Sequence, residues 1–536
     1  MKVVVLGGYG VFGGRLARLL LADGLDVVVA GRSLAKAKAF TAEHGGAALA
    51  LDLTDPSALR DVLVPGDVVV DAAGPFQAYA DYGLARLAVE CGCHALDLSD
   101  DADFTAGISE LDAAAKAAGV AVLSGVSTVP ALSSAVIEAL RGGLNEITLI
   151  ESAILPGNRA PRGRAVMAAI LSQVGRPIKT WRNGAWRELH AWSGSETRQL
   201  PKGLRRVASP IGAPDLALFP KAYEARSVLF RAGLELPLMH HSLRLLGWAH
   251  RKGLLPRLDL FTTPLLWAAE LMKGFGSDQG GMVVRVAGRD AQGAAVTGGW
   301  RLHMGQGKGP FVPAVPALLV IRRLMAEDLP PGARPALADF TLAEAEAVLA
   351  ELNGSFDRDA PDATPLFEQA LGAELWARMP ASWRRTHDVW DLNTMTGEAR
   401  VTRGSGVGAK LVAALFRFPP ARETTPVSVR MERVGQTEIW TRDFDGQRFR
   451  SVLSYSGPDV VRERFGPFTF QMSLPVRNGQ MGMPVTHGWF LGLPMPKALL
   501  PCSETREYDE DGVFRFDVKL SAPLVGMIVH YEGWLK

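Results

Sequence analysis

Cysteine is scarce in this chain of 536 residues, which has three: Cys91, Cys93 and Cys502. Three thiols do not make a disulfide framework, and their small number predicts a reducing compartment, the cytoplasm. One glycine separates Cys91 from Cys93, a spacing that also invites a redox or metal interpretation. Because no second ligand pair accompanies them, we interpret both as small residues at a helix end.

The chain also lacks a strong net charge, a long apolar run, an internal repeat and a low-complexity tract. Its formal charge is +2 and its lysines and arginines form no run, so no nucleic-acid partner is expected. No stretch reaches the roughly 18 uninterrupted apolar residues of a transmembrane helix. The apolar N-terminal run is short and ends in glycine, so we expect a strand there rather than a signal peptide.

The remaining composition is that of a globular protein, with 48% hydrophobic and 21% charged residues. At this length, about two to four domains are expected. The pattern of elements predicts three. They are an α/β domain over residues 1–128, an α+β domain over 129–352 and, after a polar linker at 353–364, a β-rich domain over 365–536.

The strongest local pattern is at the N-terminus, where the apolar run Val3–Leu6 leads into Gly8-x-Gly10-x-x-Gly13 and then into a helical pattern. Strand, glycine turn and helix form the context that a dinucleotide-binding motif requires, although a fortuitous glycine-rich turn is the alternative. Gly8 would allow the tight turn, Gly10 the approach of a pyrophosphate and Gly13 the close packing of helix on strand. The helix N-terminus would hold the phosphates. The expected cofactor contacts in this turn are Gly8, Tyr9, Gly10, Val11, Phe12 and Gly13.

The end of the second expected strand, Asp26–Ala30, indicates which dinucleotide binds. An acid at this position typically bonds the 2′-hydroxyl of NAD, but here Arg32 follows, with Ser33 beside it. A guanidinium suits a 2′-phosphate in charge and geometry, so we predict NADP(H), with Arg32 and Ser33 as contacts. The alternative is that Arg32 faces solvent. The third strand, Ala47–Leu51, ends at Asp52, which we place near the adenine or, alternatively, in an exposed turn.

Further strands continue the alternation with helices. The fourth, Asp67–Asp71, is followed by Ala73, Gly74 and Pro75, which we expect on the nicotinamide side, because ligands bind at the carboxyl ends of such strands. The fifth is His94–Leu98. This alternation predicts a Rossmann-type, doubly wound parallel sheet with helices on both faces.

Five motifs together carry a family resemblance: the glycine turn, Ala30-Gly31-Arg32-Ser33, Ala73-Gly74-Pro75-Phe76, Asp97-Leu98-Ser99 and Gly125-Val-Ser127-Thr128-Val-Pro130. In this order they resemble the saccharopine dehydrogenase-like NADP-binding oxidoreductases over the first two domains. The resemblance implies a Rossmann domain, NAD(P)(H), and a cytosolic or membrane-peripheral enzyme. Where relatives carry Gly-Glu after Asp-Leu-Ser, this chain has Asp100-Asp101.

The second domain shows both strand and helix patterns, with an Asn183-Gly184 hairpin turn. It resembles the substrate and dimerisation domain of the same family, which implies a homodimer; its last helices alternatively return to the Rossmann domain. Its segment Leu238–Phe275 carries His240, His241 and His250 among apolar and basic residues. No metal-ligand spacing appears, so we expect no metal. The open alternatives are a basic amphipathic helix pair that contacts a membrane or caps an apolar tunnel, and ordinary core or interface helices.

The last domain begins with an expected helix, Leu366–Met379, and continues in strand-like runs with Asp-Gly and Asn-Gly turns. These predict an antiparallel sheet or barrel, with an apolar interior as one possibility. Gly404-Ser-Gly406-Val-Gly408 is interpreted as a helix-start turn. The elements Trp440-Thr-Arg442-x-Phe444 and Tyr531-Glu-Gly-Trp534 resemble a domain family of unknown function that is fused to such oxidoreductases.

These patterns predict an NADP(H)-dependent oxidoreductase that transfers hydride to a C=C, C=O or C=N bond of a small-molecule substrate. The apolar segment and the β-rich domain favour a lipophilic substrate, with membrane-peripheral or lipid contact. Position alone offers Asp97, Asp100, Tyr79 and Lys308 as acid or base candidates. The alternative is a scaffold that binds NADP(H) or lipid without turnover.

Overall fold

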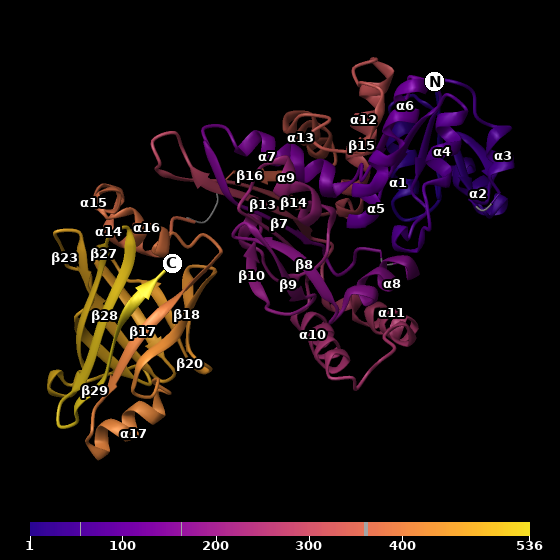
Figure 1. Ribbon diagram of the computed structural model, residues 1–536. Coiled ribbons are helices and arrows are strands. Elements are labelled where there is room, and N and C mark those ends of the chain that lie inside the picture. The colour runs from indigo at the N-terminus through magenta and orange to yellow at the C-terminus, as the bar shows by residue number, and fades with distance from the viewer. Residues whose placement is uncertain (54, 162, 359–362) are drawn as a thin grey trace. The chain divides into compact units, whose positions relative to one another are not determined.

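The computed structural model describes residues 1–53, 55–161, 163–358 and 363–536 (Figure 1). The described chain forms two compact units, one from residues 1–291 and 297–358 and the other from 292–296 and 363–536. Each unit has its own apolar core. Part of the expected linker, residues 359–362, lies outside the described residues. Ser355–Asp357, also expected in the linker, forms a strand that pairs with the second sheet.

The first sheet of unit 1 has seven strands in the order β15-β6-β5-β4-β1-β2-β3. All of its neighbours pair in parallel, as the sequence predicted for a doubly wound sheet. The strand not expected is β15, because a four-residue segment with glycine and proline at its ends shows no strand pattern. The bounds are β1 Lys2–Leu6, β2 Asp26–Gly31, β3 Ala47–Ala50, β4 Val68–Asp71, β5 His94–Asp97, β6 Ala121–Ser124 and β15 Gly332–Pro335.

Helices cover both faces of this sheet because its valine-rich strands bury alternate side chains on opposite sides. Val3 and Val5 pack with Leu16 of α1 on one face, while Val4 and Leu6 pack with Leu87 of α4 on the other. The helix α12 returns to α1, where Arg322 forms a bidentate pair with Asp23. The covering helices are α1 Gly13–Ala22, α2 Leu34–His44, α3 Pro56–Arg60, α4 Gly83–Glu90, α5 Ala102–Gly107, α6 Asp112–Ala118, α7 Ser133–Leu140, α12 Val315–Met325 and α13 Leu342–Glu351.

The second sheet of unit 1 is mixed and confirms the α+β prediction. Its main path runs β10-β11-β12-β7-β13-β14-β16, with β8 and β9 branching from β12. The Asn183-Gly184 turn joins β8 to β9 with φ angles of 50° and 71°, as a type I′ hairpin requires. Its strands are β7 Glu146–Leu155, β8 Pro177–Arg182, β9 Ala185–His190, β10 Glu196–Gln199, β11 Arg205–Pro210, β12 Ser227–Leu234, β13 Gly280–Arg289, β14 Ala295–Met304 and β16 Ser355–Asp357.

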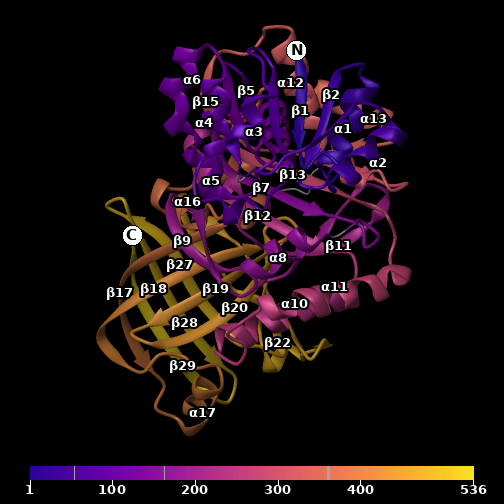
Figure 2. The same cartoon turned by 90° about the vertical axis from the view of Figure 1, so that its right-hand side faces the viewer.

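Four further helices accompany the second sheet: α8 Arg164–Gln173, α9 Pro214–Ala222, α10 Pro237–Arg251 and α11 Thr262–Leu271. Helices α8, α10 and α11 lie together and share one apolar cluster that includes Met167, Leu243 and Ala269 (Figure 2). Gly247 of α10 lets this helix approach the chain at Gly175 closely, since a Cβ there would lie 3.1 Å from the Gly175 nitrogen. The segment Leu238–Phe275 therefore forms a helix pair.

Unit 2 is built on a strongly curved sheet of thirteen strands, and all of its described pairings are antiparallel (Figure 1). This confirms the predicted antiparallel architecture. The order is β23-β24-β27-β28-β29-β17-β18-β19-β20-β21-β22-β25-β26. The bounds are β17 Leu392–Arg403, β18 Arg422–Val434, β19 Thr437–Phe444, β20 Gln447–Tyr455, β21 Val460–Phe465, β22 Phe468–Ser473, β23 Val476–Arg477, β24 Gln480–Gly482, β25 Val485–Phe490, β26 Leu493–Pro494, β27 Cys502–Glu510, β28 Val513–Ala522 and β29 Gly526–Leu535.

The helices of unit 2 are α14 Leu366–Leu371, α15 Ala373–Arg378, α16 Ala381–His387 and α17 Val407–Leu415. The single helix expected over Leu366–Met379 is wrong, because Gly372 adopts a φ of 78° and breaks it in two. Helix α17 begins within the Gly404–Gly408 segment, with Gly406 as its N-cap, so the helix-start interpretation is confirmed. It lies across one end of the curved sheet (Figures 1 and 2).

Candidate functional site

The glycine turn lies at the carboxyl end of β1, next to β4 at the middle of the parallel sheet. Gly7 has a φ of 71°, and a Cβ on it would lie 2.8 Å from the carbonyl oxygen of Ala72. A Cβ on Gly13 would lie 2.3 Å from the Gly7 oxygen, so α1 begins as close to the strand as its backbone permits. The sequence assigned the tight turn to Gly8, but the left-handed residue is Gly7. Gly8 is needed because its Cβ would lie 2.7 Å from the Val5 oxygen.

This turn fits a dinucleotide pyrophosphate. The N–H of Gly10 donates to the Gly7 oxygen at 2.7 Å, which folds the loop back over the end of β1. Val11 and Phe12 lead into the first turn of α1, where the N–H groups of Gly14 and Leu16 donate to the oxygens of Gly10 and Phe12 at 3.1 and 2.9 Å. The positive end of the helix dipole faces this turn, and it stabilises a phosphate there.

Tyr9 ties the glycine turn to the end of β2. Its hydroxyl accepts a hydrogen bond from the N–H of Ser33 at 3.0 Å. Its ring covers Gly31 so closely that a Cβ there would lie 2.7 Å from the phenol oxygen. The Tyr9 hydroxyl therefore positions protein backbone, a role that the sequence pattern did not indicate.

The residues expected at the 2′-phosphate lie at the start of α2. Ser33 is the N-cap, and its Oγ accepts from the N–H of Lys36 at 3.4 Å. Arg32 precedes it and is exposed. An exposed guanidinium beside a helix N-terminus is an arrangement that suits a phosphate dianion.

A cavity of about 370 Å³ lies below the carboxyl ends of β3, β4 and β5. Its walls are largely apolar, and its polar lining includes Asp52, Asp71, Tyr79 and Asp97. Asp52, which we expected near the adenine, therefore lines the same cavity as Tyr79 and Asp97, two of the four acid–base candidates. Ala73, Gly74 and Pro75 follow the end of β4, and the Ala73 Cα would lie 2.9 Å from a Cβ on Gly7. They therefore border the glycine turn.

Asp97 is buried at the end of β5. Its Oδ1 accepts three hydrogen bonds of 2.9 Å, from the N–H of Ser99, the N–H of Gly125 and the hydroxyl of Ser124. Burial raises the pKa of Asp97 to about 7, against the lowering effect of these bonds. The carboxyl group therefore holds the ends of β5 and β6 together and titrates near neutrality.

Asp71, at the end of β4, was not among the sequence candidates. Its Oδ1 accepts from the N–H of Ala73 at 2.9 Å and from the Tyr79 hydroxyl at 3.3 Å. Burial raises the pKa of Asp71. Burial and then the Asp71 charge raise the pKa of Tyr79 well above that of a free phenol, so Tyr79 stays protonated. The signal that could have found Asp71 is its strand-end position, the same as that of Asp97.

The other two candidates lie elsewhere. Asp100 is exposed and accepts from the Nε2 of Gln77 at 3.1 Å. The ammonium of Lys308 lies 5.3 Å from the centre of the Phe311 ring, which the guanidinium groups of Arg15 and Arg18 approach at 5.6 and 5.2 Å. Lys308 therefore joins a basic cluster beside α1 whose arginines the sequence reasoning missed, although their i, i+3 spacing places them on one helix face.

The histidines of α10 make ordinary contacts. The Nε2 of His240 lies 2.9 Å from the Ser209 hydroxyl and 3.2 Å from that of Ser195, and burial lowers the His240 pKa to about 4. The Nδ1 of His250 lies 2.7 Å from the Leu255 oxygen.

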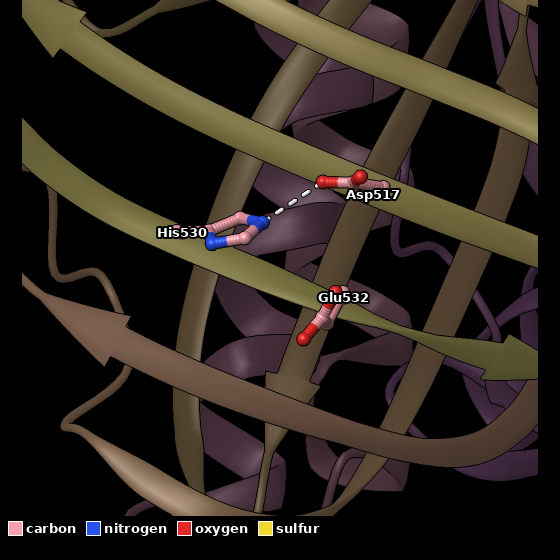
Figure 3. Close-up of side chains that lie close together, drawn as sticks. All are labelled: Asp517, His530 and Glu532. Atoms are coloured by element: carbon pink, nitrogen blue, oxygen red, sulfur yellow. Dashed lines mark hydrogen bonds and ion pairs between the residues drawn. The ribbon is translucent and has the colours of Figure 1, made fainter.

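Among the described residues, one group has the side chains and spacing to hold a metal ion: Asp517, His530 and Glu532, on neighbouring strands of unit 2 (Figure 3). Its ligand atoms lie within 4.8 Å of one another. The Nε2 of His530 lies 2.8 Å from Asp517 Oδ1, and Arg506 pairs with Asp517 Oδ2 at 2.7 Å. Because Asp517 is already shared by two basic groups, ion pairing accounts for the cluster.

The fold and the glycine turn define a Rossmann-type dinucleotide-binding protein. Residues 3–123 match the family model of the saccharopine dehydrogenase NADP binding domain, and residues 379–535 match a domain of unknown function, DUF4166. The chain therefore carries the nucleotide-binding domain of an oxidoreductase, and its cofactor is NADP(H). None of the curated proteins compared matches the chain.

Several solved structures are similar to about two-thirds of the chain. Apo saccharopine dehydrogenase (L-Glu forming) from Saccharomyces cerevisiae is 16% identical with a TM-score of 0.48, over 67% of this chain and 100% of that one. A meso-DAPDH mutant with DAP from Clostridium tetani is 14% identical with a TM-score of 0.34, over 66% and 99%. A probable dehydrogenase from Thermotoga maritima is 9% identical with a TM-score of 0.32, over 65% and 93%.

Over the described residues, no helix combines the length and apolar character that crossing a bilayer requires.

Proposed function

We propose that the protein transfers hydride between NADP(H) and a C=C, C=O or C=N bond of a lipophilic small molecule. The observation that carries this proposal is the glycine turn at the end of β1, within a domain that matches an NADP-binding family. When bound, NADPH supplies the hydride. The backbone of Gly8–Gly13 would hold its pyrophosphate, Arg32 and Ser33 its 2′-phosphate, Asp52 the adenine side, and Ala73–Pro75 the nicotinamide side.

Of the four acid–base candidates, geometry favours Asp97 and Tyr79, because they line one cavity at the carboxyl ends of the strands. Tyr79, kept protonated by burial and by Asp71, would turn its hydroxyl proton from Asp71 towards a developing negative charge on the substrate. Asp97, with a pKa of about 7, would exchange a proton near neutral pH. Asp100 and Lys308 lie outside this cavity.

The first test is binding and turnover of NADPH. The change Gly13→Ala places a Cβ 2.3 Å from the Gly7 oxygen and should displace the turn. Each lost hydrogen bond to a phosphate is worth about 1.5–3 kcal/mol, so we expect NADPH affinity to fall at least tenfold. The matched control is Gly142→Ala, where a Cβ meets open space. Equal affinity of the two variants would contradict the site.

Turnover is tested by adding a lipid extract to the protein and NADPH and following oxidation of the cofactor. Oxidation supports the lipophilic substrate, whereas oxidation with lysine-derived imines alone would contradict it. The second candidate function is a scaffold that binds NADP(H) or lipid without turnover. Tight NADPH binding without oxidation across carbonyl, imine and alkene substrates would favour the scaffold.

We also propose that unit 1 contacts an anionic bilayer through α10 and α11. Among the described residues, large apolar side chains project from α11 and from the turn that follows it: Trp267 is 79% exposed, Leu271 77% and Phe275 75%. Leu238, Leu245 and Trp248 recur on one face of α10, next to the exposed Arg244 and Arg251. Apolar side chains flanked by basic ones are the composition of an interfacial helix that binds anionic lipid. A cytoplasmic, membrane-peripheral location fits this surface.

A homodimer, implied by the family resemblance, is the remaining part of the proposal. Light scattering of the purified protein at several concentrations tests it, and a monomer throughout would contradict it.

A further inference from the structure

The concave side of the unit 2 sheet encloses a cavity of about 330 Å³. A cavity of about 150 Å³ with aliphatic and aromatic walls already binds benzene, so this one has room for a larger molecule. Most of its walls are apolar, and many are aromatic. The aromatic lining includes Phe444, Phe449, Phe514 and Phe516.

Strand alternation explains why this interior is apolar and where it is not. On β28, Phe514, Phe516 and Val518 line the cavity, while Arg515 and Asp517 lie on the other face. On the neighbouring strand β27 the inward side chains are polar: Ser503, Thr505 and Glu507. Burying three polar residues along one strand inside an apolar barrel costs stability. We therefore expect these residues to serve a function, such as binding a ligand.

The charged groups in the cavity are already held by protein partners. Arg442 bonds the Ser451 hydroxyl at 2.9 Å and pairs with Glu463 at 3.2 Å. Glu507 accepts from the indole of Trp383 at 3.2 Å and has His387 Nε2 at 2.9 Å. Among the described residues that line this cavity, no arginine or lysine is therefore left to neutralise a ligand carboxylate. A cationic ligand would have to displace one of these bonds.

A neutral donor remains. Tyr531 lines the cavity and is 7% exposed, and within the described residues its hydroxyl has no hydrogen-bond partner. Burial raises the pKa of Tyr531 to about 12, so the hydroxyl keeps its proton. The Ser503 and Thr505 hydroxyls lie 2.7 Å apart, so one of them donates its proton to the other. The proton of the accepting hydroxyl is then free to donate to a ligand, and it is a second neutral donor. These donors require an acceptor on the ligand.

We propose that unit 2 is a binding module whose cavity takes an uncharged lipophile bearing one hydrogen-bond acceptor, a carbonyl or hydroxyl oxygen, bound by Tyr531. This inference rests on unit 2 alone and holds whether or not unit 1 is a reductase.

The test uses the full chain and three probes of the same chain length: 2-decanone, decanoate and decylamine. Isothermal titration calorimetry at neutral pH should give the tightest binding to 2-decanone. The Tyr531→Phe protein should bind 2-decanone roughly 2- to 10-fold more weakly, the effect of one neutral hydrogen bond. The matched control is Tyr455→Phe, which removes a hydroxyl from a 39%-exposed tyrosine of the same sheet and should change nothing.

Three outcomes would overturn the proposal. Absence of binding by all three probes removes the cavity as a lipophile site. Tighter binding of decanoate or decylamine refutes the uncharged class of ligand. Equal affinity of the Tyr531→Phe and Tyr455→Phe proteins for 2-decanone, with thermal unfolding showing both folded, refutes the role of Tyr531.

Discussion

Two aspartates end neighbouring strands of the parallel sheet, and each one is buried with a different set of donors. Both accept their described hydrogen bonds on one oxygen, Asp97 from three donors and Asp71 from a backbone N–H and the Tyr79 hydroxyl. An amide can therefore replace either carboxylate without losing an acceptor. Replacing Asp97 by asparagine therefore removes its charge but keeps the oxygen that accepts these hydrogen bonds.

Asp97→Asn should fold and should flatten part of the pH dependence of stability. The folded pKa of about 7 lies above the ordinary value of 3.8, so the folded state holds a proton that the unfolded chain releases. Stability from this group is present below pH 3.8 and is lost as the pH rises to about 7. Urea denaturation at a series of pH values should show a smaller decline for the variant. An unchanged decline would assign the pH dependence to other groups, such as Asp215, whose pKa burial also raises to about 7.

Arg32→Asp should shift cofactor preference from NADPH to NADH. The exposed guanidinium at the start of α2 is expected to make charge-assisted bonds worth about 1.5–3 kcal/mol, so NADPH affinity should fall roughly 10- to 100-fold. The control is Lys38→Asp, which makes the same charge change at an exposed position of α2. If both variants weaken NADPH binding equally, the loss comes from the changed net charge near the site and not from a direct contact of Arg32 with the 2′-phosphate.

At the scale of elements, α10 and α11 are helices with an apolar cluster on one side and apolar side chains exposed on the other. A helix that is apolar on both sides needs a second apolar surface to cover its exposed side, such as a lipid bilayer or a protein partner. Trp248 and Trp267 are the largest exposed groups of this surface, at 46% and 79% exposure. They are therefore the residues whose removal should matter most.

Trp248→Ala with Trp267→Ala should reduce binding of the full protein to phosphatidylglycerol vesicles at least tenfold in a flotation assay. The physical reason is the loss of buried apolar area, worth about 1.5–3 kcal/mol per large side chain. Trp186→Ala is the control, since it removes a tryptophan that is 50% exposed on the β8–β9 hairpin. Equal retention of the control and the double variant on the vesicles would contradict a membrane role for this surface.

The sequence predicted the strands and turns whose apolar or glycine residues follow a regular pattern, and it did not predict those whose pattern is interrupted. The valine runs of β1, β2 and β4 and the Asn183-Gly184 hairpin follow directly from local pattern. Strands β17 and β27 were missed because charged and polar residues interrupt their apolar positions. For β27 this interruption is the polar lining of the cavity. The cofactor turn could be placed from the sequence, but the Asp71–Tyr79 pair could not, because the segment that folds Tyr79 back to the end of β4 has no regular period.

For the whole molecule, separate cores imply separate unfolding. The clusters around the parallel sheet contain residues of unit 1, and the cluster inside the curved sheet contains residues of unit 2. Differential scanning calorimetry should therefore resolve two transitions. NADPH at about 100 times its dissociation constant should stabilise one of them by about 2.7 kcal/mol, because it binds one folded unit. A uniform shift of both transitions would show that the units unfold together.

The strand β15 has a consequence for synthesis of the chain. It pairs in parallel with β6, and the Gly332 N–H bonds the Val120 oxygen at 2.9 Å, so the outer edge of the nucleotide-binding sheet is completed by residues far along the chain. While the ribosome makes the second sheet, β6 remains an unpaired edge, which is a hazard for misassociation. The nascent domain acquires its full complement of strands after residue 335 has emerged.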